Sequence, residues 1–385
     1  MSLPRKQFGS VCNLVNGKAF KPTDWSSAGV PIIRIQNLND SDKPFNHWAG
    51  ALDKQVLVKT GDLLLAWSGT PGTSFGAHIW SGPNGILNQH IFRCDLDQKA
   101  ITREWARIAV NHRLHRLIEQ AHGGVGLQHV TRGMVEELEI PLPPLAEQRR
   151  IAEVLDRAEA LRSKRRATLA QLDTLTQSLF LDLFGDPMTN QKGWTICLLE
   201  DIAKKITDGT HKTPVYKDSG IEFLSAKDLK DGGIAWGTEK FISEHEHREL
   251  VRRCNPELGD ILLAKSGSLG SVAIIDRSHQ FSLFESLCLI KHDRERIEGQ
   301  FLTGLLRAPS MLAHLLGKNK GVAIKHLHLV DVRNLRIPLP PISLQREFAR
   351  RVTAVEALKT AQRASLAELD ALFATLQHRA FRGEL

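Results

Sequence analysis

Two pairs of histidines, each with one residue between its members, are the first place to look for metal chemistry in this chain. One pair lies in His245-Glu246-His247 and the other in His326-Leu327-His328. On a helix, side chains at positions i and i+2 point apart, so neither pair forms a metal-binding face. Ser243 and Glu246 have the spacing of a capping box, which satisfies backbone N–H groups at a helix start. The pattern favours a capped helix, and we expect no metal site.

Catalytic motifs for acting on DNA are missing as well. A methyltransferase needs a glycine-rich cofactor turn and a motif such as N-P-P-Y, to which Asn255-Pro256-Glu257-Leu258 is the nearest fragment. No GxxxxGK[ST] motif of a translocating NTPase occurs. The triplets Asp97-Gln98-Lys99 and Asp228-Leu229-Lys230 resemble the end of a nuclease motif, but neither has a Pro-Asp upstream. The sequence predicts no catalytic residue and no cofactor.

Two loops rich in glycine and serine, Ser68–Gly76 and Ser266–Gly270, could hold phosphates through backbone N–H groups. A nucleotide cofactor is the weaker interpretation of these loops. Each loop could instead contact the backbone of a nucleic-acid duplex or simply form a tight turn.

Charge favours a polyanionic partner. The 385 residues carry a net charge of +8 with a pI near 9.3, which suits nucleic acid. Residues 1–140 hold 15 Lys+Arg against 12 Asp+Glu, and residues 188–337 hold 22 against 19. Each segment therefore has a modest positive surplus, as expected of a protein that touches nucleic acid twice, although a merely basic enzyme would look similar.

The sequence shows neither a membrane-spanning segment nor a signal peptide. No apolar run approaches the ~20 residues that cross a bilayer, and the first residues, MSLPRKQFGS, lack the apolar core of a signal peptide. The five cysteines are scattered without a CxxC pair and indicate reduced structural thiols. We expect a cytoplasmic protein with no membrane partner.

The strongest pattern is an internal repeat of 197 residues. Ile140–Pro144 matches Ile337–Pro341 letter for letter, and 20 of the 45 positions from Ile140 to Phe184 recur without a gap. A duplication at this period predicts two similar domains and not a solenoid. We expect domains at 1–140 and 188–337, each followed by a helical segment, at 141–187 and 338–385.

Both helical segments are long, and after the first Pro-Leu-Pro-Pro the stretch Ala146–Phe184 contains no glycine or proline. A helix of forty residues is ~60 Å long, more than one small domain can bury, so it needs a partner along its length. The two helices are expected to pair as an antiparallel coiled coil, although each could instead dock on its own domain. The charged stretch Arg162–Arg166 interrupts the apolar seam. The expected pairing positions are Ile151, Leu155, Leu169, Leu172 and Leu179 in the first helix and Val352, Val355, Leu366, Leu369 and Leu376 in the second.

The domains themselves are expected to be mixed α/β, which makes the fold class α+β with a pseudo-twofold repeat. In the first domain, strands are predicted at Val30–Leu38, within Gly61–Trp67 and at Ile86–Arg93, and a helix at Glu104–Gln120. Thr131 should cap a short helix before the lead-in. In the second domain, Ile221–Leu229 aligns with the first of these strands, Gly259–Ser268 with Gly61–Thr70, and Gly321–His326 with Gly124–His129. The loops between these segments differ, as expected if one fold reads two different targets.

These motifs resemble the specificity subunit of type I restriction–modification enzymes. The resemblance rests on Gly29–Leu38, Gly61–Thr70, Asp208–Pro214 and the two Pro-Leu-Pro-Pro segments, and it covers essentially the whole chain. It implies two target-recognition domains that each read half of a bipartite DNA site, and a pair of helices that sets the gap. It also implies no catalysis in this subunit, and assembly with two adenine-methyltransferase subunits and with restriction subunits.

Residues that touch DNA are expected on the loops and strand ends that differ between the two domains. Base recognition needs hydrogen-bonding side chains at base edges, whereas phosphate contacts only position the protein. The candidates are Lys18, Lys21, Arg34, Asn37, Ser68, Thr70, Thr73, Gln89 and His90 in the first domain and Thr210, His211, Lys212, Lys227, Lys265, Ser266 and Ser268 in the second. For each of them a solvated or turn-forming role is the alternative.

The sequence is also compatible with two other functions. One is a stand-alone sequence-specific DNA-binding or scaffold protein of a related defence system. The other is an enzyme whose motifs are not recognised. A cofactor that copurifies with the chain would favour the enzyme, and methylation that requires methyltransferase subunits would favour the specificity subunit.

Overall fold

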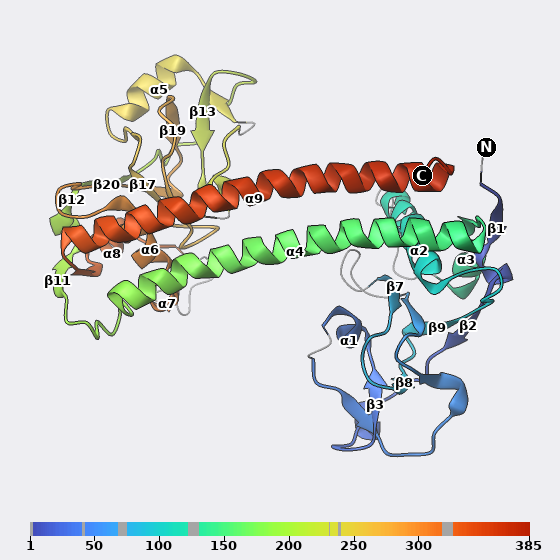
Figure 1. The fold of residues 1–385 in the computed structure, drawn as a ribbon. Coiled ribbons are helices and arrows are strands. Elements are labelled where there is room, and N and C mark those ends of the chain that lie inside the picture. The colour runs from blue at the N-terminus through green and yellow to red at the C-terminus, as the bar shows by residue number, and fades with distance from the viewer. Residues whose placement is uncertain are drawn as a thin grey trace. The chain divides into compact units, whose positions relative to one another are not determined.

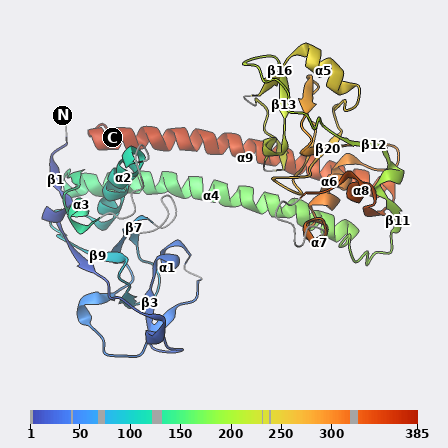
Figure 2. The ribbon, with the colours of Figure 1, turned by 180° about the vertical axis from the view of Figure 1, so that it is seen from behind.

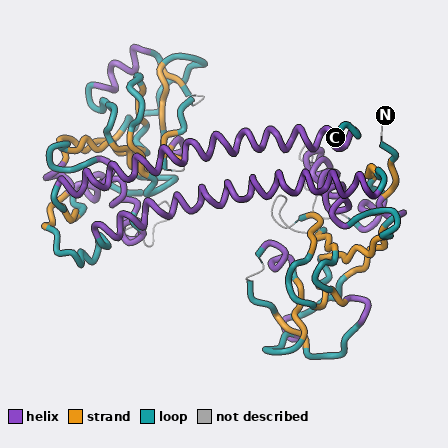
Figure 3. The backbone as a smooth tube through the Cα atoms, viewed as in Figure 1, coloured by secondary structure: helices purple, strands orange, loops and turns teal. Residues whose placement is uncertain are grey.

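The structure is a computed structural model and describes residues 3–40, 43–67, 75–121, 131–230, 232–237, 240–317 and 326–385. The chain divides into two compact units. Unit 1 is formed by residues 1–164 with 366–385, and unit 2 by residues 165–365. Each unit combines one mixed α/β domain with parts of both long helices (Figure 1). Figure 3 distinguishes the strands of each unit from these helices by colour.

Unit 1 contains two four-stranded sheets. The first has the order β2 (Cys12–Asn16), β9 (Ile91–Leu96), β6 (Leu63–Ala66), β7 (Gly76–Ile79) and is antiparallel throughout. The second has the order β4 (Asn46–Trp48), β3 (Val30–Ile33), β8 (Gly85–Leu87), β5 (Leu57–Val58), with β3 and β8 parallel. Strand β6 is buried along its whole length because its alternate side chains enter two different cores.

The remaining elements of unit 1 close the domain onto the long helix. Strand β1 (Arg5–Gln7) pairs with β10 (Glu139–Pro141), directly before α4 (Leu145–Phe184). The other elements are η1 (Phe8–Ser10), η2 (Pro22–Asp24), α1 (Ile35–Asn39), η3 (Lys54–Val56), α2 (Arg103–Ala121) and α3 (Arg132–Glu136). Thr131 caps α3 as predicted, its hydroxyl accepting a hydrogen bond from Met134 N–H.

Unit 2 repeats this plan with local changes. Its antiparallel sheet has the order β12 (Ala203–Asp208), β20 (Leu287–His292), β17 (Ile261–Ala264), β18 (Val272–Ile274). The second sheet has the order β16 (Phe241–Ile242), β13 (Ile221–Leu224), β19 (Phe281–Leu283). Strand β11 (Thr195–Leu198) pairs with β21 (Arg336–Leu339) directly before α9 (Ile342–Arg382), as β1 pairs with β10 in unit 1. The other elements are η4 (Leu199–Ile202), η5 (Ala226–Asp228), β14 (Leu229–Lys230), β15 (Gly233–Ile234), α5 (Glu244–Val251), α6 (Gly299–Arg307), α7 (Pro309–Gly317) and α8 (Leu329–Arg333).

The two long helices pack together in each unit and run antiparallel there (Figures 1 and 2). In unit 1, Arg162 Nε donates to Asp370 Oδ1 at 2.5 Å, and its guanidinium lies 4.4 Å from the ring centroid of Phe373. In unit 2, Lys359 Nζ lies 2.9 Å from Asp173 Oδ1. Lys359 and Asp370 are the repeats, 197 residues later, of Arg162 and Asp173, so the two contacts are equivalent. The charged residues in the middle of the helices therefore form ion pairs between α4 and α9.

The predicted pairing positions fall into two groups. Ile151, Leu155, Val352 and Val355 are buried. Ile151 and Leu155 belong to the core around Trp105, and Val352 to the core of unit 2, so these parts of the helices also dock on the domains. The predicted pairing of the two helices is confirmed, and each helix also docks on a domain core at these positions. The half-buried group is Leu169, Leu172, Leu179, Leu366, Leu369 and Leu376.

Two predicted strands were too long, and a third combined two separate strands. Val30–Leu38 is strand only to Ile33, because the Asn37 side chain accepts the Arg34 N–H at 3.1 Å and starts a helix. Ile221–Leu229 ends at Leu224, where Asp228 accepts the N–H of Ser225 at 2.7 Å. Ile86–Arg93 is two strands in different sheets, β8 and β9. The aligned segments Gly124–His129 and Gly321–Lys325 lie outside the described residues.

Candidate nucleic-acid interface

The loop that leaves the first strand of the four-stranded sheet β2-β9-β6-β7 in unit 1 has an equivalent after β12 in unit 2. Gly17 N–H donates to Ile91 O and Gly209 N–H to Leu287 O, both at 3.3 Å. A Cβ on Gly17 would lie 2.0 Å from Asn88 O, and one on Gly209 would lie 2.0 Å from Leu283 O. Only glycine fits such a close backbone approach. Asn16-Gly17-Lys18 and Asp208-Gly209-Thr210 are therefore the same turn on the same framework.

Aromatic rings hold the cations of unit 1 near this turn. Lys18 Nζ lies 4.3 Å from the ring centroid of Trp48, and the guanidinium of Arg34 lies 5.2 Å from that of Trp25. A ring face attracts a cation and restricts it without neutralising its charge. Lys18 and Arg34 are half-buried, and Lys21 is exposed. This part of unit 1 is therefore positively charged, and the aromatic rings restrict Lys18 and Arg34.

The other candidates of unit 1 have different surroundings. Gln89 Nε2 lies 3.3 Å from His90 Nε2, and the His90 ring lies 5.4 Å from Trp67. Asn37 is buried, and its amide also donates to Lys43 O at 3.1 Å, so its role is to shape the loop. Ser68, Thr70 and Thr73 lie outside the described residues.

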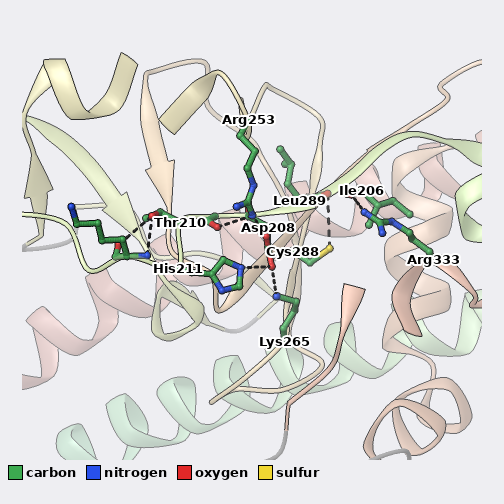
Figure 4. Close-up of polar contacts among 11 residues, drawn as sticks. Ile206, Asp208, Thr210, His211, Arg253, Lys265, Cys288, Leu289 and Arg333 are labelled. Atoms are coloured by element: carbon green, nitrogen blue, oxygen red, sulfur yellow. Dashed lines mark hydrogen bonds and ion pairs between the residues drawn. The ribbon is translucent and has the colours of Figure 1, made fainter. Parts of the chain in front are cut away.

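In unit 2, four charged or titratable side chains converge at the equivalent turn (Figure 4). Lys265 Nζ donates to Asp208 Oδ2 at 2.5 Å, and His211 Nε2 lies 3.2 Å from the same oxygen. Arg253 Nη2 contacts Asp208 Oδ1 and donates to the carbonyl oxygens of Asp208 at 3.1 Å and Gly209 at 3.2 Å. The Asp208 and Lys265 side chains are 3% and 2% exposed, whereas those of Arg253 and His211 are 55% and 63% exposed. A buried ion pair thus lies beneath two exposed side chains.

The electrostatics of this cluster keep the carboxylate ionised. Burial alone would raise the pKa of Asp208, but the hydrogen bond and charge of Lys265, with the charges of Arg253 and His211, hold it below its usual value. One carboxylate thus faces two basic side chains, Lys265 and Arg253. The cluster carries a positive surplus at neutral pH, which suits a phosphate or an electronegative base edge.

The remaining candidates of unit 2 are exposed or half-buried. Lys212 is exposed, and its backbone N–H donates to Thr210 Oγ1 at 3.1 Å within the turn. Lys227 and Ser268 are exposed, and Thr210 and Ser266 are half-buried. Lys265 is placed differently from the expectation, because its ammonium group is buried against Asp208 and acts within the protein.

Arg253 is the functional candidate that sequence reasoning missed. It follows α5 and lies 45 residues from Asp208 along the chain. No spacing rule links these two positions, and only the tertiary structure brings them together. Trp25 and Trp48 were also missed, because the cations that they hold come from separate segments.

No group of three metal-ligating side chains occurs in the described ranges. Across the same ranges, no helix has the length and apolar character of a membrane span. All five cysteines are free thiols, and burial raises the pKa of Cys254 to about 12.

The sequence profile described as "Type I restriction modification DNA specificity domain" matches residues 5–172 and again residues 191–370. The chain belongs to this family. Each match contains one of the two equivalent turns. The membership confirms the resemblance seen in the sequence and identifies the chain as a non-catalytic specificity subunit for DNA sequence recognition.

Curated relatives match over most of the chain. The chain is 26% identical to the type I restriction enzyme EcoBI specificity subunit of Escherichia coli, over 99% of this chain and 86% of that one. It is 23% identical to the MjaVIII specificity subunit of Methanocaldococcus jannaschii, over 80% of this chain and 75% of that one. Among solved structures, the S subunit from M. genitalium has a TM-score of 0.59 at 16% identity, covering 99% of this chain and 96% of its own. That likeness shows a shared fold, with two mixed domains and two long helices.

Proposed function

We propose that this specificity subunit reads a bipartite site in double-stranded DNA, one half with each recognition domain. The observation that carries the proposal is the pair of equivalent turns. Asn16-Gly17-Lys18 and Asp208-Gly209-Thr210 have the same backbone hydrogen bonds but different side chains and different neighbours. A shared framework with different polar side chains suits two readers of two different base sequences.

The sequence-based domains 1–140 and 188–337 are the proposed readers, and the segments 141–187 and 338–385 are the proposed spacer. Helices of 40 and 41 residues are ~60 Å long, which is more than one turn of B-DNA at about 34 Å. Linked readers gain affinity only when the linker matches the distance between their sites. The helix pair would therefore set the number of unread base pairs between the half-sites.

The same helices offer equivalent surfaces for two copies of a partner. Leu161 and its repeat Leu358 are 54% and 52% exposed, and Leu175 and its repeat Leu372 are 40% and 50% exposed. Leu161 and Leu372 belong to unit 1, and Leu358 and Leu175 to unit 2. We propose that these leucines contact two adenine-methyltransferase subunits, with restriction subunits joining in the full enzyme. The complex would act in the cytoplasm, where the DNA is.

Selection from a library of randomised duplexes tests the reading function. The purified chain is expected to enrich two short blocks of defined sequence at one fixed gap. Enrichment of a single block, or of no block, would contradict the bipartite assignment. A chain that selects two blocks but binds no methyltransferase subunit would favour the stand-alone DNA-binding protein.

A further inference from the structure

The second recognition domain contains a buried ion pair, Asp208–Lys265, at positions where the first domain has uncharged residues. Hydrogen bonds fix the equivalence of the positions, since Trp67 N–H donates to His90 O at 3.3 Å and Lys265 N–H to Ser286 O at 2.8 Å. With the glycine turns aligned as above, Asn16 is equivalent to Asp208 and Trp67 to Lys265. An exposed amide and a ring stacked on Phe92 thus stand where unit 2 has Asp208 and Lys265.

This difference argues that the ion pair is not needed to form the fold. Removing two charges from water costs free energy that their attraction often does not recover, and apolar replacements of similar volume are frequently neutral. Unit 1 builds the same sheet order and the same glycine turn without either charge. A costly feature that the framework does not require is best explained by what it holds in place.

We infer that the Asp208–Lys265 pair is a positioning device that sets Arg253 and His211 for reading the second half-site. Arg253 Nη2 contacts Asp208 Oδ1, while His211 Nε2 lies 3.2 Å from Oδ2. The ammonium group of Lys265, 2.5 Å from Oδ2, fixes the carboxylate from inside the domain. Figure 4 shows Arg253 and Lys265 approaching this carboxylate from opposite sides.

The geometry leaves Arg253 able to bind DNA. All its hydrogen bonds to the described residues use Nη2, so Nε and Nη1 keep their donors for a ligand. Arginine with two free donors recognises guanine or a phosphate group, and a fixed guanidinium does so with less loss of conformational entropy. The ligand class is duplex DNA, so the inference rests on the proposed function and assigns these residues to one half of the site.

A second ion pair in the same sheet provides a matched control. Lys291 Nζ lies 2.7 Å from Asp260 Oδ2, and the Asp260 side chain is 5% exposed. Asp260 precedes β17 and Lys265 follows it, so the two pairs lie at opposite ends of one strand. Unit 1 has an equivalent of Asp260. Its Asp62 accepts a hydrogen bond from the Lys59 N–H, as Asp260 accepts one from the Glu257 N–H.

The test is duplex selection with the full chain, comparing wild type with the Asp208→Asn/Lys265→Met and Asp260→Asn/Lys291→Met variants. Both variants remove a pair completely, which leaves no single charge buried. We expect the first to keep the first block and lose at least tenfold in discrimination at the second block, and the control to change discrimination less than twofold. Thermal unfolding of each variant checks the fold. An unchanged second block in the first variant would overturn the inference.

Two further outcomes have defined meanings. If the Asp208→Asn/Lys265→Met variant does not fold, Arg253→Gln replaces it, because this side chain is exposed and its loss should spare the fold. Weakening of the second block alone supports the inference, and equal weakening of both blocks or of neither overturns it. A wild-type chain that selects no two-block site contradicts the proposed function itself, which separates that failure from failure of the positioning role.

Discussion

Gln148 and Gln345, 197 residues apart, are fully buried and make the same hydrogen bonds in the two units. Gln148 accepts the Thr102 N–H at 2.9 Å and donates to Pro143 O at 2.8 Å. Gln345 accepts the Glu298 N–H at 2.9 Å and donates to Pro340 O at 2.8 Å. Each glutamine ties the start of a long helix to the loop before a domain helix, which explains why the repeated segment extends beyond the prolines.

The Gln148→Leu substitution should lower the free energy of unfolding of unit 1 by about 3 kcal/mol, because it leaves a buried N–H and buried carbonyls unpaired. Gln345→Leu should do the same in unit 2. Chemical denaturation measures the loss of stability. Hydrogen exchange at the Thr102 and Glu298 N–H groups shows which unit is destabilised. Gln171→Leu, at an exposed position of α4, is the control and should change stability by less than about 0.5 kcal/mol. An equally small effect of Gln148→Leu would refute this role.

Lengthening both helices should lengthen the gap in the DNA site. Four residues inserted after Lys164 and four after the equivalent Ala361 add about 6 Å of helix, or about two base pairs. Duplex selection should return the same two blocks with the gap increased by about two. An insertion in α4 alone shifts its register against α9 and should abolish two-block selection. An unchanged gap with both insertions would show that the helices do not measure the distance.

Lys18 should contact a phosphate group and not a base. The Lys18→Ala variant should then bind specific and nonspecific duplexes more weakly by a similar factor. It should also reduce the slope of log Kd against log salt concentration by about one. Fluorescence anisotropy at several salt concentrations measures this slope. Lys59→Ala removes an exposed lysine at the opposite end of β6 and should leave the slope unchanged. A change in the preferred bases with Lys18→Ala would assign Lys18 to base recognition instead.

The exposed leucines of the helices should govern partner binding without affecting the fold. Native mass spectrometry should show two methyltransferase subunits on the wild-type chain, one on Leu161→Ser and none on Leu161→Ser/Leu358→Ser. Leu258→Ser replaces a leucine in unit 2 that is 51% exposed and should retain both subunits. Two bound subunits on the double variant would exclude these leucines from the contact.

Acid should destabilise unit 2 through His292. Burial lowers the pKa of His292 to about 4, so between pH 6.5 and 4 the unfolded chain binds more protons than the folded chain. Stability is therefore present above about pH 6.5 and falls toward pH 4, by at most about 3 kcal/mol. The His292→Gln variant should lose this component when unfolding is measured across that range. His245→Gln, at an exposed position, should keep the wild-type pH profile, and an identical profile in both variants would rule out His292.

The sequence predicted the features that depend on local periodicity or on the duplication. The helices α4 and α9 and the cap at Thr131 needed only spacing and proline or glycine signals. The end of β3 was missed because the helix start depends on hydrogen bonds of the Asn37 side chain to Arg34 N–H and Lys43 O, which the apolar pattern of the strand does not reveal. Lys265 was assigned to DNA because an ammonium group is normally solvated, and its burial follows from Asp208 on another strand. Arg253 carries no sequence signal at all, because its role depends on a partner 45 residues away.

Methylation mapping tests the central claim most directly. The purified chain is mixed with its candidate methyltransferase subunit on genomic DNA, and modified adenines are located by sequencing. The account predicts methylation at one motif of two blocks with a fixed gap, which requires both proteins. Methylation that persists when this chain is omitted, or that follows no two-block motif, would contradict it.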